Sequence, residues 1–236
     1  DDETWLSRGL AKGGLAELLA RSGGKAAADR FEEALKDYDQ ALKLNPDRPE
    51  TWMRRGLTKR KLAGTKRDPA PLCRDAIDDI SEALARGPWM AGAWEARGSV
   101  RISLGRCVMS SRGDAAAIFR DAVSDLDEAI QRAPGREPLW RERGVAKDFW
   151  GVCLAQRGKE SWQQLDGALA DFNQAAELNP RDADTFWYRG NNRFNRGIYR
   201  ENQGQNASAE FRAALADYDR MESLEPKLAE QVKGQR

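Results

Sequence analysis

Arginine and aspartate recur at fixed positions along this chain, and their spacing is the first sign of possible chemistry. The arginines are Arg8, Arg55, Arg97, Arg143 and Arg189, and the aspartates are Asp37, Asp79, Asp125, Asp171 and Asp217. Such a set could form a ladder of charges that faces a ligand. It could equally form an Arg–Asp contact built into every repeat, because a planar guanidinium fits a carboxylate. We favour the built-in contact, since a ligand seldom needs five identical contacts.

A second basic set follows four residues after each arginine. Its members are Lys12, Lys59, Arg101, Lys147 and Arg193. They could form a stripe for an anionic partner such as an RNA backbone. However, no aromatic residues alternate with them as base stacking would require, and 39 basic residues nearly balance 38 acidic ones. A salt-bridged edge is the simpler interpretation, and nucleic-acid binding is the weaker alternative.

Catalysis and metal binding find little support in the composition. The chain has no histidine, and Cys73, Cys107 and Cys153 form no CxxC pair. We therefore expect no zinc site, no cofactor and no enzymatic activity, and we expect three buried thiols. No apolar run reaches about 18 residues, so no membrane helix is expected. The odd thiol count favours a cytoplasmic location, and a start at Asp1 suggests a missing upstream segment.

The elements that position these residues are internal repeats. Each repeat opens with an aromatic residue, followed four residues later by glycine, and a later segment carries an alanine. The aromatic positions are Trp5, Trp52, Trp94, Trp140 and Phe186; the glycines are Gly9, Gly56, Gly98, Gly144 and Gly190; the alanines are Ala34, Ala76, Ala122, Ala168 and Ala214. Because glycine destabilises a helix by about 0.5–1 kcal/mol relative to alanine, its recurrence requires a packing reason. We expect close helix crossings at these positions, and aromatic rings that fill the space between neighbouring repeats.

Each repeat reads as two helical segments that are separated by a polar, Gly-rich break and end near a proline. The predicted units cover residues 2–46, 49–88, 91–134, 137–180 and 183–226, with a polar cap or tail over 227–236. The distance from each of the first four prolines to the next aromatic position is constant, as from Pro46 to Trp52. We therefore expect one continuous stack of units over residues 1–236.

This pattern resembles the tetratricopeptide repeat over nearly the whole chain. The resemblance implies an all-α fold, a right-handed superhelix of five helix pairs whose first helices line a concave groove. The usual repeat has about 34 residues, whereas successive glycines here lie 42 to 47 residues apart. We expect both helices of each pair to be longer than usual, with Leu15, Leu62, Leu104 and Trp150 forming a core in the extension.

The resemblance also implies which residues face the groove. In chain order they are Glu50, Met53, Arg54, Leu57, Arg60, Lys61, Glu95, Ser99, Ile102, Ser103, Arg141, Val145, Asp148, Phe149, Asp184, Trp187, Tyr188, Asn191, Phe194 and Asn195. The last six stand out, because aromatic rings and amides on one face could anchor a peptide. Alternatively, Trp187 and Tyr188 could pack on the terminal segment.

The function that follows is a noncatalytic scaffold that binds a peptide or partner segment in the groove. The lysine–asparagine clamp by which one subfamily holds a chaperone's C-terminal carboxylate is absent, because leucines and Met53 occupy its positions. Two alternatives stay open. The chain could be a self-assembling or regulatory module of a larger protein, a homo-oligomer included, or it could bind nucleic acid through the second basic set.

Overall fold

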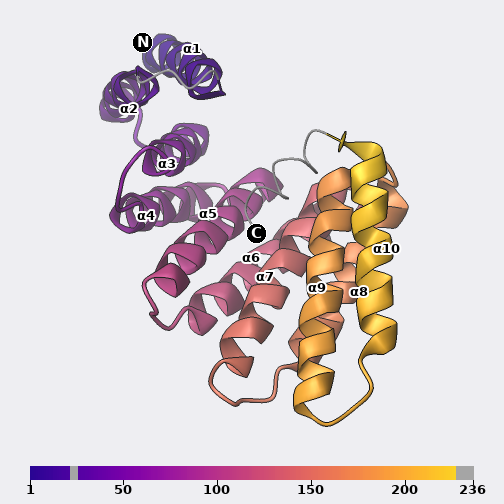
Figure 1. Cartoon of the computed structure of the whole chain (residues 1–236). Coiled ribbons are helices and arrows are strands. Elements are labelled where there is room, and N and C mark those ends of the chain that lie inside the picture. Colours follow the sequence, from indigo (N-terminus) through magenta and orange to yellow (C-terminus); the bar gives the residue numbers. More distant parts are fainter. Residues whose placement is uncertain (22–25, 227–236) are drawn as a thin grey trace. The chain divides into compact units, whose positions relative to one another are not determined.

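The computed structural model describes residues 1–21 and 26–226, and these contain ten helices and no strand. Close contacts divide the chain into two compact units, Asp1–Gly113 and Asp114–Arg236, which we call unit 1 and unit 2 and describe separately (Figure 1). The predicted all-α fold of helix pairs is confirmed. The single stack over 1–236 stays a prediction, and the predicted cap over 227–236 lies outside the described residues.

The helices alternate between a first and a second member of each pair. Unit 1 contains α1 (Asp2–Arg21), α2 (Ala27–Leu44), α3 (Pro49–Ala63), α4 (Ala70–Arg86) and α5 (Ala91–Ser110). Unit 2 contains α6 (Ala116–Arg132), α7 (Glu137–Ala155), α8 (Trp162–Leu178), α9 (Ala183–Asn202) and α10 (Ser208–Leu224). The odd-numbered helices are the first members, and they carry the aromatic and glycine positions of the repeat.

Within each unit the helices form two layers. Inside a unit, each helix contacts the next one along the chain, and α9 and α10 lie side by side in Figure 1. Among the helices of one unit, first helices also contact each other, as α1 with α3, α3 with α5, and α7 with α9. One layer therefore consists of first helices and the other of second helices, so residues on successive first helices can share one face.

The lengthening of the repeat lies in the helices rather than in the turns. The ten helices have 15 to 20 residues each, and the turns inside the later pairs are short. Gly158 and Gly204 adopt positive φ angles of 63° and 70° in two of these turns, and Arg112 takes the same conformation at 58°. Polar side chains then cap the second helices, as where Asp68 Oδ1 accepts a hydrogen bond of 3.1 Å from the Ala70 N–H. The prediction of extended helices is thereby supported.

Close helix crossings explain the recurring glycines. A Cβ atom on Gly144 would lie 2.7 Å from Cε1 of Phe172, and one on Gly9 would lie 2.6 Å from Cε1 of Tyr38. The alanines of the partner helices are buried, with exposed fractions of 0–2% for Ala34, Ala76, Ala122, Ala168 and Ala214. The second helix therefore approaches the first more closely than any side chain at the glycine would permit.

A second position of close approach lies seven residues after each glycine, in the lengthened part of the first helix. A Cβ on Gly197 would lie 2.5 Å from Phe211 Cε1, and one on Gly151 would lie 2.9 Å from Leu165 Cδ2. Alanine occupies the same position in α1, where buried Ala16 packs in a cluster with Phe31. Of the core predicted for this region, Leu62 and Leu104 are buried, Trp150 is half-buried, and Leu15 is 46% exposed. The extension thus has a core of its own, built mainly on a position that the sequence analysis overlooked.

The tryptophans of the repeat phrase are half-buried, whereas Phe186 at the same position is buried. The indole Nε1 of Trp52 donates a hydrogen bond of 2.7 Å to the Pro46 carbonyl oxygen, and Trp94 and Trp140 repeat this bond at 2.8 Å with Pro88 and Pro134. An arginine three residues later covers each ring, at 4.0 to 5.0 Å from the centroid. These rings therefore fix the linker between repeats through a polar bond and a cation–π contact.

Candidate partner-binding surface

The recurring aspartates form ion pairs with arginines of the first basic set and with Lys or Arg of the second. The Arg–Asp contact built into the repeat is therefore present. Arg143 Nη2 lies 2.6 Å from Asp171 Oδ1, and Lys147 Nζ lies 2.8 Å from Asp171 Oδ2. The same arrangement of Arg, Asp and Lys or Arg occurs at Asp37, Asp79 and Asp217. In the third repeat, Arg97 belongs to unit 1 and Asp125 to unit 2. Each of the four aspartates is nearly buried, and its two cations are therefore engaged inside the repeat.

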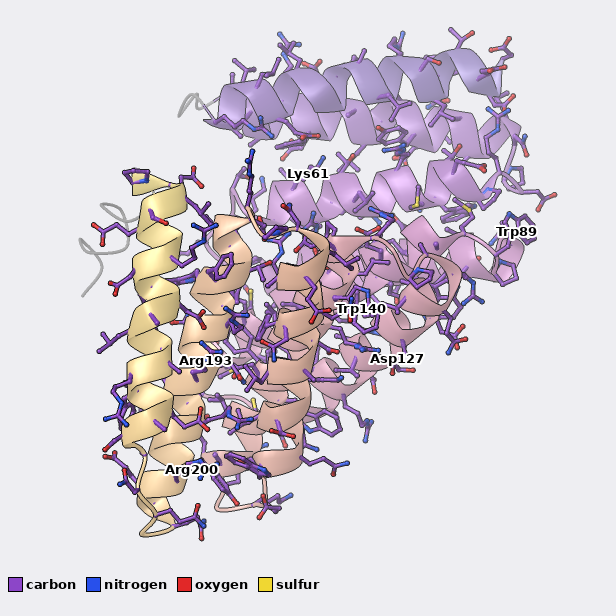
Figure 2. The ribbon with its side chains drawn as sticks, turned by 90° about the vertical axis from the view of Figure 1, so that its right-hand side faces the viewer. Lys61, Trp89, Asp127, Trp140, Arg193 and Arg200 are labelled. Atoms are coloured by element: carbon purple, nitrogen blue, oxygen red, sulfur yellow. The ribbon has the colours of Figure 1, made fainter. Side chains whose placement is uncertain are left out.

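The arginine of each of the last four repeats also reaches back to the preceding repeat. Arg143 Nη1 lies 2.6 Å from Asp127 on α6, and Arg55 Nη1 lies 2.7 Å from Asp39 on α2. The corresponding acceptors for Arg97 and Arg189 are Ser81 Oγ at 3.0 Å and Asn173 Oδ1 at 3.1 Å. Asp127 and Trp140 are labelled in Figure 2. In the repeats of Arg55, Arg143 and Arg189, one guanidinium thus joins the two helices of its own repeat to one helix of the repeat before it.

Several predicted groove residues link successive first helices to each other. In unit 1, Lys61 on α3 forms an ion pair with Glu17 on α1, while Met53 is 9% exposed and Arg54 is exposed. In unit 2, Arg141 on α7 lies 3.1 Å from Asp184 on α9. These contacts place the predicted positions on the first-helix layer and use part of their polar capacity within the protein.

Asp148 forms a buried polar network between α7 and α9. Its two carboxylate oxygens accept hydrogen bonds from Asn192 Nδ2 at 2.8 Å and from Asn195 Nδ2 at 2.9 Å. Burial raises the pKa of Asp148 to about 6, although the two amides favour the charged form. Asn192 is fully buried and was overlooked by the sequence analysis. The predicted pair Asp148 and Asn195 therefore meet each other directly.

The predicted aromatic anchors of unit 2 pack mostly on other rings. The ring centroids of Trp187 and of Tyr218 on α10 lie 5.5 Å apart, and the Tyr218 hydroxyl donates a hydrogen bond of 2.9 Å to Asn191 Oδ1. Tyr188 stacks on Phe172 and Phe149 on Phe119, at 6.4 and 5.3 Å between ring centroids. Phe194 packs partly against Phe211 but is 48% exposed. Phe194 is therefore the most accessible of these rings. The alternative packing on 227–236 lies outside the described residues.

A cavity of about 510 Å³ opens between α3, α4 and α5 in unit 1. Its lining residues are Arg60, Lys61, Ala63, Gly64, Pro69, Cys73, Ser103, Arg106, Cys107 and Ser110. We call this the α3–α5 cavity. Arg60, Lys61 and Ser103 are groove positions that the sequence analysis named, so two successive first helices contribute to one hollow.

The sequence analysis missed other members of this cavity. Cys73 and Cys153 are buried as predicted, but Cys107 is half-buried and lines the cavity. Burial raises the pKa of the Cys73 thiol to about 11. Arg106 and Ser110 lie in the lengthened part of α5, beyond the positions to which the resemblance extends. Trp89, in the turn between α4 and α5, is 71% exposed (Figure 2) and was also overlooked.

Comparison with known proteins places this arrangement among helical repeats. The family model of the TPR repeat, the tetratricopeptide repeat, matches residues 27–62. MamA from Desulfovibrio magneticus RS-1 is similar in structure at 15% identity, covering 93% of this chain and 96% of that chain with a TM-score of 0.61. TTC0263, a thermophilic TPR protein of Thermus thermophilus, gives 23% identity, 95% and 96% coverage and a TM-score of 0.61. Comparison with curated proteins gives no significant match.

YrrB, described as a TPR protein with an unusual peptide-binding site, gives 23% identity, 94% and 90% coverage and a TM-score of 0.51. Repeated antiparallel helix pairs define the class of helical-repeat proteins, whose fold supports protein–protein interaction. More specifically, residues 27–62 match the tetratricopeptide-repeat model, and the chain shares its fold with solved tetratricopeptide-repeat proteins while its helices are longer. None of the helices in the described ranges is long and apolar enough to cross a membrane.

Proposed function

We propose that this protein is a scaffold that binds an extended segment of a partner protein along its first-helix layer, with the α3–α5 cavity as a principal contact. One observation carries the proposal: the groove positions Arg60, Lys61 and Ser103, from successive first helices, line a single open hollow of about 510 Å³. Hollows of this size accommodate side chains of a bound segment. In contrast, the arginines, aspartates and tryptophans of the repeat are occupied in packing.

Phe194 is a separate candidate contact within unit 2. It is the predicted anchor that offers the most exposed ring, while Asn191, Asn195 and Tyr188 contact other residues of the unit. We therefore assign binding to Phe194, while these three neighbours stabilise the first-helix face through contacts within unit 2. Met53 and Asp148, both buried, take the same supporting task.

A selection of peptides from a random library on the immobilised protein tests this function. The wild-type chain should enrich related sequences, and Ser103→Trp, which fills the α3–α5 cavity, should lose them. Ala85→Trp is the matched control, because Ala85 is exposed on α4 and lies outside the cavity lining. Both variants should keep the helical circular-dichroism signal. Peptides that bind Ser103→Trp as well as wild type would remove the cavity from the proposal.

The two alternatives from the sequence receive separate measurements. RNA binding through the second basic set has little support, because Lys12, Lys59, Lys147 and Arg193 each contact an aspartate. A salt titration with single-stranded RNA would still detect it, since phosphate binding weakens steeply with salt. Light scattering over a range of concentrations measures self-association. A mass that grows with concentration would favour the assembly alternative over the peptide scaffold.

A further inference from the structure

The α3–α5 cavity carries a strongly one-sided charge. Of its lining residues that the structure describes, Arg60, Lys61 and Arg106 are cationic and none is a carboxylate. Ser103 and Ser110 add hydroxyl groups at the same wall. Lys61 is partly neutralised by Glu17, which lies on α1 outside the lining. The local excess of positive charge contrasts with a net charge of +1 for the whole chain.

Arg60 uses little of its hydrogen-bonding capacity within the protein. Its Nη1 donates to Ser99 Oγ over a long distance of 3.4 Å, and its Nε is buried without a hydrogen-bond partner. By comparison, the guanidinium of Arg143 binds Asp171 through two nitrogens at 2.9 and 2.6 Å and Asp127 through the third at 2.6 Å. A guanidinium that lines a cavity and has few partners within the protein is suited to a carboxylate, which can accept two parallel bonds.

A neighbouring hollow of about 540 Å³ continues the basic surface. It shares Pro69, Cys107 and Ser110 with the first cavity and adds Arg67 and Arg74. Asp68 is the carboxylate among its described lining residues, and this side chain caps α4 through the Ala70 N–H. The start of α4 at Ala70 also brings the positive end of a helix dipole to this hollow. The basic surface is therefore long enough for more than one acidic residue.

We propose that the α3–α5 cavity takes carboxylate side chains, so that the partner segment is an acidic peptide whose Asp or Glu residues contact Arg60 and Arg106. This inference rests on the proposed function and adds the chemical class of the partner. All residues that line the two basic hollows belong to unit 1, so unit 1 is where an acidic segment would be held.

Two labelled peptides test the inference on the full chain by fluorescence anisotropy. One is a short Gly/Ser peptide with several spaced Glu residues, and its twin carries Gln at the same positions. At about 0.15 M salt, where exposed charges are screened beyond roughly 8 Å, the Glu peptide should bind at least about tenfold more tightly than the Gln peptide. Arg60→Gln and Arg106→Gln should each weaken the Glu peptide by about tenfold.

Arg30→Gln provides the matched control, because Arg30 is exposed on the second helix α2 and lies outside the lining of both hollows. It should leave the affinity for the Glu peptide unchanged, and thermal unfolding should show that all three variants are folded. An equal loss in Arg30→Gln would show diffuse attraction to the protein surface and would overturn the assignment to the cavity. Displacement of the Glu peptide by an equal concentration of inorganic phosphate would show a site for free oxyanions, which also overturns it.

The outcome separates this inference from the function on which it rests. Library peptides that require an open cavity but show no enrichment of Asp or Glu, and bind Arg60→Gln as well as wild type, would refute the acidic partner alone. If no library peptide and neither labelled peptide binds, the peptide-scaffold function fails together with the inference.

Discussion

The indole nitrogen of Trp52 donates a hydrogen bond of 2.7 Å to the carbonyl oxygen of Pro46. Pro46 follows the end of α2 at Leu44, where helix carbonyls lack partners within the helix. Trp52 lies in α3, so the bond crosses from one helix pair to the next. The constant number of residues between proline and tryptophan in the sequence is the separation that allows this bond to form.

Replacement of Trp52 by phenylalanine keeps most of the ring but removes the donor. We expect Trp52→Phe to lower the free energy of unfolding by about 1 kcal/mol, the usual net contribution of one hydrogen bond. Urea unfolding followed by circular dichroism measures the change. Trp89→Phe is the control, because Trp89 is 71% exposed and its replacement should change stability by less than about 0.5 kcal/mol. Equal effects of the two substitutions would show that the bond to Pro46 contributes nothing.

Removal of Arg143 should be more costly, because it leaves a buried carboxylate with one cation. Asp171 is 3% exposed and would keep only Lys147, while the link to Asp127 on α6 would be lost. We expect Arg143→Ala to destabilise the protein by about 3 kcal/mol, measured as a lower unfolding midpoint. Arg120→Ala, which breaks the exposed pair with Asp121, should cost less than about 1 kcal/mol. Similar midpoints for the two variants would contradict a structural role for Arg143.

Two helix glycines, the recurring Gly144 and the non-recurring Gly14, should respond to alanine in opposite directions according to their surroundings. Gly144→Ala would place Cβ 2.7 Å from Phe172, whose ring is fully buried, and should destabilise by about 1–3 kcal/mol. Gly14→Ala in α1 meets no atom within 4 Å and should stabilise by about 0.5–1 kcal/mol, because alanine favours the helix. Thermal unfolding of both variants checks the signs. Stabilisation by Gly144→Ala would mean that Phe172 moves freely.

Asp148 should make the stability of unit 2 depend on pH. Its pKa rises from 3.8 to about 6 on folding, so the folded state binds more protons than the unfolded state between these values. The stabilisation is fully present below about pH 4 and is lost as pH rises through about 6, by about 3 kcal/mol in total.

Asp148→Asn removes this titration, and the difference in unfolding free energy between wild type and variant should therefore change across that range. The comparison of two proteins is needed because Asp37, Asp114 and Glu160, whose pKa values are lowered by hydrogen bonds, give the opposite trend in both. A difference that stays constant from pH 4 to pH 7 would show that Asp148 is ionised throughout.

The repeating residues made the fold predictable from the sequence. Gly144 and Ala168 recur with their equivalents in every repeat, and their small size at helix crossings has one simple physical reason. The proline after each second helix likewise marked the helix ends, as Pro46 does after Leu44. Periodic constraints of this kind identify which positions face each other without any knowledge of the surroundings.

The binding surface was less predictable, because it depends on side chains that do not repeat. The sequence could place Asn195 and Asp148 on the same face but could not show that the amide would bond to the carboxylate. Nor could it show that the Tyr218 hydroxyl would donate a hydrogen bond to Asn191 Oδ1. It also could not show that Arg60, whose Nε has no hydrogen-bond partner, would line one cavity with Cys107. Such pairings depend on the distance and angle between neighbouring helices, which hydrophobic spacing leaves undetermined.

The bond between tryptophan and proline also bears on how such a chain can change in length. A repeat such as the one from α3 to α4 carries the donor, Trp52, near its start and an acceptor, Pro88, after its end. The repeat also carries Arg55 near its start and Ser81 on its second helix, and Ser81 accepts a hydrogen bond from Arg97, the equivalent arginine of the next repeat. A tandem copy of this repeat would therefore meet its own complementary groups at the new junction. Duplication or deletion of a whole repeat therefore needs no compensating substitution at the junction. The number of repeats can change during evolution while the contacts between neighbouring repeats stay the same.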